Sequence, residues 1–345
     1  MKFALIGCGD IGSLRAAAIS RMNGSRLVAV ADADAARARK LAASYGAVLA
    51  SNWRDLVQRD DLDAVIVSTP PPLHAEMCIQ ALENGKHVLC EKPLARTPEE
   101  CKQILDTAAR MNRVLATGFN YRFYPAILKA REILYSGLIG ELDHIRSYAG
   151  HPGGSEFTHP WVHDVNVMGG GALLDNGIHI IDLTRYFLGE VAEVKGYATN
   201  KVWGFPGCED NGFALLKSPS GKIASLQASW SEWRGYRFQI EVYGTRGCVR
   251  ASYPPMMTQM VRMDSSGSKA RRKIYMFPLL QVVERVRSYR WTGLQSFIKE
   301  LTAFTQTIFG EKTALALGLD GLNSVKIAHA VYQSTRAGTS IIIRN

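Results

Sequence analysis

The sequence lacks any run of eighteen or so uninterrupted apolar residues, which is the length that a membrane-spanning helix needs. The short apolar run from Met1 to Ile6 is broken by Gly7 before any cleavage-like sequence, so it differs from a secretory signal peptide. No internal repeat or low-complexity tract occurs. We therefore expect a cytoplasmic protein with no integral membrane segment.

The chain has only six cysteines and no Cys-x-x-Cys pair. In a chain of 345 residues, this pattern favours free, buried thiols in a reducing compartment over a disulfide framework or a cysteine zinc site. The formal net charge is +10, but no recognisable nucleic-acid-binding module accompanies it. We expect no nucleic-acid partner.

The length favours two domains, and the pattern of apolar and polar residues changes near Tyr121. Before that point, short β-rich apolar runs alternate with helical stretches, which is typical of a parallel sheet covered on both faces. From Val191 to Arg250, the pattern predicts successive antiparallel strands separated by turns, and two helices close the chain.

The segment Gly7-Cys8-Gly9-Asp10-Ile11-Gly12 follows the first predicted strand and opens a helix. Gly7 permits a sharp turn, Gly9 lets the backbone approach a pyrophosphate, and Gly12 allows close packing of helix on sheet. The N–H groups at the helix start, around Asp10 and Ile11, can then bind the anion. A purely structural turn is the alternative.

Asp32 ends the second predicted strand, where a carboxylate can accept hydrogen bonds from the adenosine ribose. A carboxylate there repels a 2′-phosphate, so the sequence favours NAD over NADP. Asp34 could share or replace this role, or one of the two acids could cap a helix.

Glu91-Lys92-Pro93 follows a strand that should end at the same sheet edge as the glycine loop. Ligands of such sheets bind beyond the carboxyl ends of the strands, so Lys92 should face the nicotinamide half of the crevice. A lysine there suits proton exchange with an alcohol. The alternative is an exposed lysine at a turn.

A second polar constellation follows the glycines at 169–171. A helix beginning near Asp175 would place Asp175, His179, Asp182 and Tyr186 on one face. Alternatively, Asp175 is a helix cap and His179 a buried, hydrogen-bonded imidazole. A metal ion could also be shared with nearby histidines, but no full ligand set with metal-like spacing is visible, so we predict no metal site.

Together, the glycine loop, Glu91-Lys92-Pro93 and the segment leading to Asp175 and His179 resemble the Gfo/Idh/MocA oxidoreductases, the family of glucose–fructose oxidoreductase and inositol dehydrogenase. The resemblance extends over nearly the whole chain and includes Ser68-Thr69-Pro70 with His74, Gly118 to Arg122, and Asp320-Gly321-Leu322.

The resemblance implies an α/β fold with two domains. Residues 1–121 would form an NAD(P)-binding Rossmann domain with a doubly wound parallel sheet. Residues 122–345 would form an α/β domain with a large, mostly antiparallel open sheet for substrate binding and oligomerisation. We expect a homo-oligomer, either a dimer or a tetramer.

The resemblance also implies roles at matching positions. Lys92 would be the catalytic acid/base, His179 a second proton-handling group, and Asp175 the residue that orients the substrate or His179. The residues that would border the nicotinamide and its ribose are Thr69, Pro70, His74, Glu91, Lys92 and Asn120. The residues that would contact substrate are Lys92, Arg122, His163, Asp175 and His179. The sequence departs from the family at Pro71, where Asn or Ser is frequent, and at His163, where many relatives carry arginine.

We predict an NAD-dependent dehydrogenase that transfers a hydride from a secondary hydroxyl of a sugar, cyclitol or nucleotide sugar to nicotinamide. One alternative is a redox-neutral sugar-modifying enzyme with tightly bound NAD. Another is a non-catalytic NAD(P)-binding sensor or regulator, because the same fold occurs in enzymes and in regulators that bind NAD(P) without turning it over.

Basic residues gather between Arg262 and Arg290. The favoured interpretation is a solvent-facing strand pair and loop. A sharper hypothesis places this segment near the active-site mouth, where Arg271 and Arg272 would receive an anionic substrate such as a nucleotide sugar.

Overall fold

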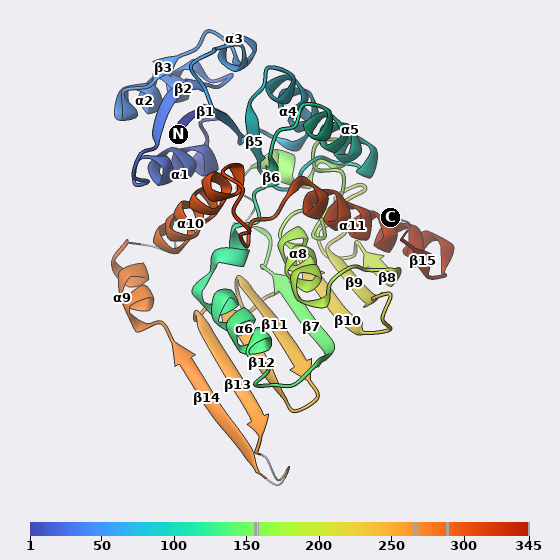
Figure 1. Cartoon of the computed structure of the whole chain (residues 1–345). Coiled ribbons are helices and arrows are strands. Elements are labelled where there is room, and N and C mark those ends of the chain that lie inside the picture. The colour runs from blue at the N-terminus through green and yellow to red at the C-terminus, as the bar shows by residue number, and fades with distance from the viewer. Residues whose placement is uncertain (155–156, 158, 265–266, 268, 288–289, 344–345) are drawn as a thin grey trace. The chain divides into compact units, whose positions relative to one another are not determined.

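The computed structural model describes residues 1–154, 157, 159–264, 267, 269–287 and 290–343. The chain divides into two compact units, which are described separately (Figure 1). Unit 1 comprises Met1–Phe123 and Arg287–Asn323, and unit 2 comprises Tyr124–Val286 and Ser324–Asn345.

Unit 1 is built on a six-stranded parallel sheet of order β3-β2-β1-β4-β5-β6. The strands are β1 (Lys2–Ile6), β2 (Arg26–Ala31), β3 (Val48–Leu49), β4 (Ala64–Val67), β5 (His87–Cys90) and β6 (Leu115–Thr117). Residues of β1 and β4 are almost all buried, as expected for strands covered on both faces. The predicted doubly wound sheet is confirmed.

Helices follow the strands of unit 1 in turn. They are α1 (Asp10–Ile19), α2 (Ala35–Tyr45), α3 (Trp53–Val57), α4 (His74–Glu83), α5 (Pro98–Arg110) and α10 (Arg290–Ile308), with 3₁₀ turns η1 (Pro71–Leu73) and η2 (Asn120–Phe123). The sequence explains their ends locally. At α5, Thr97 accepts a hydrogen bond from the Glu100 N–H, and Pro98 occupies the first helical position.

Helix α10 belongs to unit 1, whereas the predicted division put it with residues 122–345. The reason is packing: Leu294, Phe297 and Leu301 are buried in one core with residues of β1 and α1. Such a contact joins residues almost 300 positions apart, and helical periodicity alone does not reveal which core a helix covers. Helix α11 (Gly318–Ala337) begins in unit 1 and ends in unit 2.

Unit 2 contains a nine-stranded sheet of order β14-β13-β12-β11-β7-β10-β9-β8-β15. Its strands are β7 (Leu142–Gly150), β8 (Glu193–Thr199), β9 (Asn211–Lys217), β10 (Ile223–Ser229), β11 (Arg237–Gly244), β12 (Gly247–Tyr253), β13 (Met257–Met263), β14 (Ala270–Met276) and β15 (Ile341–Ile342). Within this sheet, β7 and β10 are the only described strands that pair in parallel. The predicted mostly antiparallel open sheet is confirmed.

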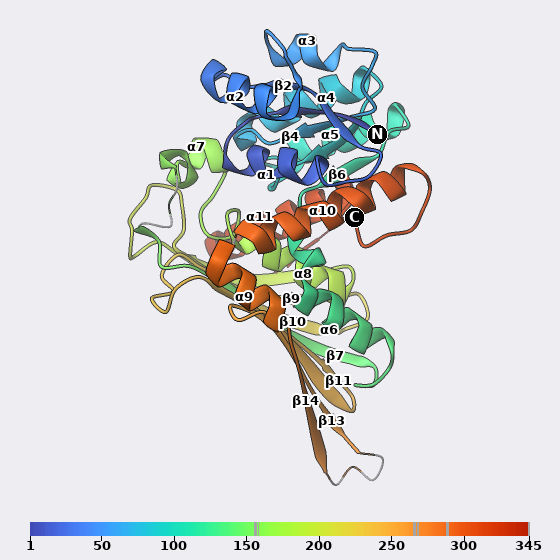
Figure 2. The ribbon, with the colours of Figure 1, turned by 90° about the vertical axis from the view of Figure 1, so that its left-hand side faces the viewer.

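Two helices cover one face of this sheet. Helix α6 (Pro125–Tyr135) packs on β12 and β13, and α8 (Gly177–Leu188) packs on β7, β10 and β11. Figure 2, in which the long strands are seen nearly edge-on, shows α6 and α8 on the same side. The other helices are α7 (Val165–Met168) and α9 (Pro278–Arg287), with the 3₁₀ turn η4 (Pro160–His163). Strand β9 alternates buried and exposed residues, so one of its two faces is exposed to solvent.

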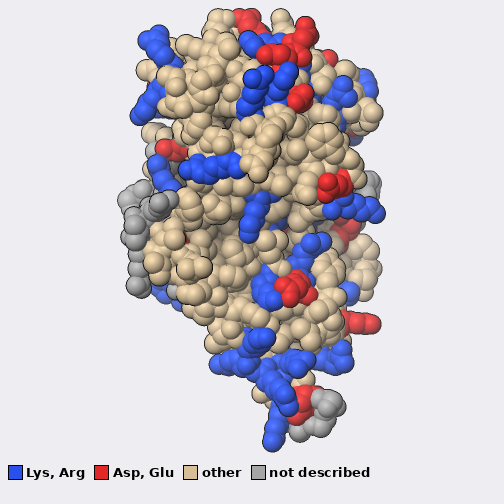
Figure 3. Space-filling view, turned by 60° about the vertical axis from the view of Figure 1, so that its left-hand side comes forward, with Lys and Arg blue, Asp and Glu red and all other residues tan. Residues whose placement is uncertain are grey.

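The first part of the basic segment lies in the hairpin of β13 and β14, which confirms the predicted strand pair. The loop expected after this pair is wrong, because Pro278–Arg287 form the helix α9. Strand β14 is the edge of the sheet, and nearly all its residues are exposed. Figure 3 shows Lys and Arg side chains gathered over this hairpin at the lower end of the view.

Candidate active site

The glycine loop of unit 1 connects β1 to α1. Gly7 has a φ of +94°, and a Cβ on it would lie 2.4 Å from the Ser68 carbonyl oxygen. A Cβ on Gly12 would lie 1.9 Å from the Gly7 carbonyl oxygen, whereas one on Gly9 would meet no atom within 4 Å. The fold itself therefore requires glycine at positions 7 and 12. Gly9 instead leaves open space beside the N-terminus of α1, where N–H groups can bind an anion.

The two acids after β2 have different partners. Asp32 accepts hydrogen bonds from the Cys8 N–H at 2.5 Å and the Asp34 N–H at 2.7 Å, so its carboxylate is fixed beside the glycine loop. Asp34 caps α2 through the N–H groups of Ala36 and Arg37. Of the two candidates, Asp32 is the one held at the loop, and Asp34 is the helix cap.

A buried ion-pair network holds the loop that carries Lys92. Glu91 receives a hydrogen bond from Arg15 Nε at 2.7 Å, and Arg15 also pairs with Glu300 of α10. Arg15 is 0% exposed, and its guanidinium lies 4.1 Å from the centre of the Phe297 ring. Burial opposes its charge, but the carboxylates of Glu300 and Glu91 outweigh this effect and raise the pKa of Arg15. Sequence reasoning did not identify Arg15 or Glu300.

His74 joins the two loops predicted to border the nicotinamide. Its Nδ1 lies 2.9 Å from the Pro93 carbonyl oxygen, and its Nε2 lies 2.8 Å from the Thr69 carbonyl oxygen. The ring is 0% exposed, and this burial lowers the pKa of His74 against the opposing effect of the two carbonyls. His74 therefore links the backbones of Thr69 and Pro93, and its predicted place beside the nicotinamide stays a prediction.

Two further predicted residues follow β6 and are buried in unit 1. Asn120 donates from Nδ2 to the Ser296 hydroxyl of α10 at 2.8 Å. Arg122 forms an ion pair with Asp320 at 3.3 Å, and its Nη1 donates to the Leu315 carbonyl at 3.4 Å. This placement ties β6 to the start of α11, and the predicted substrate contact of Arg122 stays a prediction.

In unit 2, the helix expected to begin near Asp175 is α8, which begins at Gly177. The expected place of Asp175 on the face of that helix is wrong. The chain makes turns from Ala172 to Asn176, and the Asp175 N–H bonds to the Gly171 carbonyl at 3.0 Å. The glycines at 169–171 allow this compact turn, and helix propensity alone does not predict where such a turn ends and the helix begins. Asp175 thus precedes α8 and is neither on its helical face nor its cap.

The Asp175 carboxylate is held by two ring N–H groups. Its Oδ2 accepts from the Trp230 indole at 3.0 Å and from His151 Nε2 at 3.3 Å. The Gly153 N–H donates to His151 Nδ1 at 3.1 Å, so the hydrogen on the ring sits at Nε2, facing the carboxylate. Sequence reasoning missed both His151 and Trp230. The available signal was their position, directly after the ends of β7 and β10.

The remaining predicted residues of unit 2 lie on either side of this turn. His179 and Asp182 are buried within α8, three residues apart on the helix. His163 stacks on Phe205 with ring centres 4.0 Å apart, and Phe157 packs against His163 edge-on. The loop before His163 contains residues 155, 156 and 158, which lie outside the described residues. The His163 substrate contact remains a prediction.

Glu209, from the connection between β8 and β9, fixes the glycine-rich loop. Its carboxylate accepts the N–H groups of Gly171 at 2.8 Å and Leu173 at 2.7 Å. The Tyr332 hydroxyl of α11 donates to it at 3.0 Å. Burial outweighs these hydrogen bonds and raises the pKa of Glu209 to about 7. The loop that leads to Asp175 therefore rests on a buried carboxylate that the sequence did not reveal.

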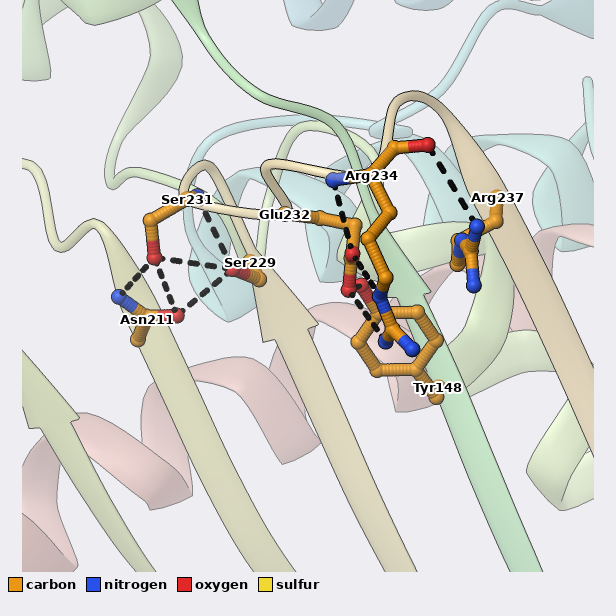
Figure 4. A network of polar contacts seen from close by, with 7 residues as sticks. All are labelled: Tyr148, Asn211, Ser229, Ser231, Glu232, Arg234 and Arg237. Carbon is orange, nitrogen blue, oxygen red and sulfur yellow. Dashed lines mark hydrogen bonds and ion pairs between the residues drawn. The ribbon is translucent and has the colours of Figure 1, made fainter.

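A polar network lies at the same end of the sheet (Figure 4). Tyr148 donates a hydrogen bond to Glu232, and Arg234 Nε donates to Glu232 at 2.7 Å. The hydrogen bonds from Arg234 and Tyr148 lower the pKa of Glu232 to about 2. The Glu232 N–H bonds to the His151 carbonyl at 3.1 Å, so the network also holds the backbone of His151. A neighbouring group links Asn211, Ser229 and Ser231.

The basic hairpin lies at the opposite end of this sheet. The register can be followed from β14 across the sheet to β7. Arg271 of β14 pairs with Arg262 of β13, and Arg262 pairs with Gly247 of β12. Gly247 pairs with Gly244 of β11, which pairs with Leu142 at the start of β7. The end of β7, which leads to the His151 cluster, is about 26 Å away at 3.3 Å per residue. The hypothesis that Arg271 and Arg272 line the mouth of the Asp175 cluster is therefore wrong, because strand register separates them.

No group of three or more His, Cys, Asp or Glu side chains suited to a metal ion occurs among the described residues. In that part of the chain, no helix is both long and apolar enough to span a membrane.

Comparison with known proteins identifies relatives over the full chain. Residues 1–119 match the model of an oxidoreductase family with an NAD-binding Rossmann fold, and residues 127–250 match a GFO/IDH/MocA C-terminal domain. The inositol 2-dehydrogenase of Rhizobium meliloti is 29% identical, over 99% of both chains. A dTDP-3,4-didehydro-2,6-dideoxy-alpha-D-glucose 3-reductase of Saccharopolyspora spinosa is 31% identical, over 77% of this chain and 80% of its own. The crystal structure of an NAD binding oxidoreductase from Klebsiella pneumoniae matches with a TM-score of 0.87 and 25% identity, over 100% of this chain and 99% of its own.

Proposed function

The chain belongs to the Gfo/Idh/MocA family of oxidoreductases, and we propose that it is an NAD-dependent dehydrogenase acting on a secondary hydroxyl of a sugar, cyclitol or nucleotide sugar. By their names, one relative acts on a cyclitol and another on a dTDP-sugar. The observation that carries the proposal is the Asp175 carboxylate, which His151 and Trp230 hold in unit 2. A carboxylate whose direction is fixed in this way is suited to accepting a hydrogen bond from a substrate hydroxyl group.

The residues of unit 1 fit a nicotinamide dinucleotide. The open space at Gly9 and the N-terminus of α1 suit its diphosphate, and Asp32 suits the hydroxyls of the adenosine ribose. Because the Cys8 and Asp34 N–H groups hold the Asp32 carboxylate, its charge stays where a 2′-phosphate would be repelled. This arrangement supports NAD over NADP. When bound, the cofactor supplies a nicotinamide ring that accepts or returns a hydride.

Lys92 is the proposed acid/base of unit 1. Its neighbours on both sides are anchored, Glu91 by Arg15 and Pro93 by His74, so the backbone that presents Lys92 Nζ is held in place. Preorganisation of this kind lowers the cost of orienting the group in the transition state. In our proposal, Lys92 Nζ takes a proton from the substrate hydroxyl during oxidation and gives it back during reduction.

Asp175 and His179 are the proposed catalytic residues of unit 2. Asp175 would accept a hydrogen bond from the substrate and orient it, while His179 would be a second group that can relay the hydroxyl proton. His151 acts through Asp175, because its Nε2 hydrogen fixes the direction of the carboxylate. Positioned proton transfer of this kind typically contributes a factor of about 10² to 10⁴ in rate.

Other parts of unit 2 support a homo-oligomer. The face of the sheet that none of the described helices covers carries exposed apolar side chains, namely Tyr197, Phe213, Leu215 and Ile223. Apolar surface of this kind is frequent where proteins associate. All six cysteines are free thiols, which supports the cytoplasm as the compartment.

The proposed function is tested by following the reduction of NAD+ by absorbance over a panel of cyclitols, free sugars and nucleotide sugars. We expect one class to support turnover, with NAD+ preferred to NADP+. Binding of NAD+ with no reduction by any member of the panel would favour the sensor instead. Cofactor that survives purification, with conversion of a sugar but no net reduction, would favour the redox-neutral enzyme.

A further inference from the structure

The first residue of α10 lies beside the first residue of α1. Arg290 Nη2 is 3.1 Å from Asp10 Oδ1, although the two residues are 280 positions apart in sequence. Asp10 directly follows Gly9, the glycine whose Cβ position is open. Arg290 thus brings a guanidinium from the end of the basic segment to the edge of the glycine loop.

Buried contacts in unit 1 set this position. Arg15 of α1 pairs with Glu300, and its guanidinium lies against the ring of Phe297, both on α10. Arg290 meets Asp10 while residues 297 and 300 meet Arg15, so the two helices run in the same sense. The exposed pair of Asp10 and Arg290, at 61% and 58% side-chain exposure, is therefore set by the packing of the helices and not by its own attraction alone.

Helices that run in the same sense bring their N-termini to the same end. Each helix N-terminus carries a partial positive charge and N–H groups without helical partners. At this end, the Asp10 carboxylate opposes the approach of an anion. A diphosphate placed at Gly9 would bring two more negative charges, so a cation that offsets Asp10 would favour its binding.

Arg290 supplies that cation. A guanidinium has five N–H donors, more than its contact with Asp10 uses, and its planar fork suits phosphate oxygens. We propose that Arg290 binds the diphosphate of the cofactor while it neutralises Asp10. This inference rests on the proposed function, because it takes a dinucleotide as the ligand of the glycine loop.

The test compares the full-length chain with Arg290→Gln in the binding of NAD+, ADP-ribose and adenosine by calorimetry. At low ionic strength we expect Arg290→Gln to weaken binding of NAD+ and ADP-ribose about tenfold, the loss of one charge-assisted hydrogen bond. Adenosine, which has no phosphate, should bind equally to both proteins. Added salt should reduce the difference, because it screens exposed charges.

Two variants complete the test. Arg59→Gln removes the same charge from a partly exposed pair with Asp61, in the loop before β4, and should leave NAD+ binding unchanged. Asp10→Asn, with Arg290 in place, should tighten NAD+ binding, and the double variant should recover most of the lost affinity. Asp10→Asn keeps the proposal open to refutation even if Arg290→Gln fails to fold.

The outcomes distinguish the role of Arg290 in diphosphate binding from the proposed function as a whole. Equal affinity of wild type and Arg290→Gln for NAD+ and ADP-ribose at low salt overturns the role of Arg290 alone. A loss that is as large for adenosine as for ADP-ribose also overturns it, since the effect would not concern the diphosphate. Failure of the wild type to bind NAD+ overturns the proposed function, and this inference with it.

Discussion

Glu209 and Tyr332 meet at 3.0 Å beneath the glycine-rich loop of unit 2, where the Tyr332 hydroxyl donates to the buried carboxylate. A Cβ on Gly170 would lie 2.2 Å from that hydroxyl, and one on Gly171 would lie 2.2 Å from the Glu209 carbonyl oxygen. The glycines are thus explained by the close approach of this pair. The pair in turn holds the loop that ends at Asp175.

The pair predicts how stability depends on pH. Burial raises the pKa of Glu209 from 4.5 to about 7, so the folded state favours the protonated acid. The stabilisation from this group is fully present below pH 4.5 and is lost as pH rises through 7. Between these values we expect the free energy of unfolding of the wild type to fall by about 2–3 kcal/mol relative to Glu209→Gln, since each pKa unit is worth about 1.4 kcal/mol.

The measurement is urea unfolding of both proteins at several pH values from 4 to 8, where m values should stay equal. Tyr332→Phe serves as the control, because it removes one donor and keeps the ionisable group. If the difference in free energy of unfolding between wild type and Glu209→Gln stayed constant from pH 4 to 8, the raised pKa of Glu209 would be refuted.

The glycine loop yields a matched pair of variants. In Gly12→Ala the new Cβ would clash with the Gly7 carbonyl, so we expect a loss of stability of about 2–3 kcal/mol. In Gly9→Ala the Cβ meets nothing, and stability should change by no more than about 0.5 kcal/mol. The same methyl group would occupy the space that we assign to the diphosphate, so NAD+ binding should weaken about tenfold or more. Thermal unfolding and calorimetry separate the two effects, and unchanged NAD+ affinity in Gly9→Ala would count against the site.

The two acids after β2 provide a second matched pair. Asp32→Ala removes the carboxylate that the Cys8 N–H holds, and we expect the ratio of the NAD+ and NADP+ affinities to fall about tenfold, or about 1.4 kcal/mol. Asp34→Ala removes the cap of α2, which should cost about 1 kcal/mol in stability and leave the cofactor preference unchanged. If Asp34→Ala shifted the preference and Asp32→Ala did not, the roles of the two acids would be reversed.

Local sequence predicted those parts of the site whose physical causes are local. The glycine loop and Asp32 depend on a strand, a turn and a helix start within a few residues. The links of His151 to Asp175, Arg15 to Glu300 and Tyr332 to Glu209 join residues that are 24, 285 and 123 positions apart. No periodicity encodes such links, because they depend on which elements pack together. The place of Asp175 in a turn before α8 was missed for a related reason: Glu209 holds the glycine-rich loop that leads to it.

Lys92 carries the claim that the chain is an enzyme and not only a dinucleotide-binding protein. We expect Lys92→Ala to lower turnover by a factor of about 10² to 10⁴ and to leave NADH binding nearly intact, because the variant loses proton transfer and keeps the glycine loop. Lys102→Ala is the control, since Lys102 is an exposed lysine paired with Asp106 on α5. Steady-state kinetics and NADH titration measure the two effects. Turnover of Lys92→Ala at the wild-type rate would contradict the assigned role.

The central claim is that the protein passes a hydride from a substrate carbon to nicotinamide. The most direct measurement uses a substrate that reduces NAD+, labelled with deuterium on the carbon that bears the reacting hydroxyl, and analyses the cofactor by mass spectrometry and NMR. The account predicts that the deuterium appears at C4 of the nicotinamide in free NADH, and that Lys92→Ala slows its appearance. Deuterium that stays on the sugar, or returns to it without release of NADH, would contradict the account.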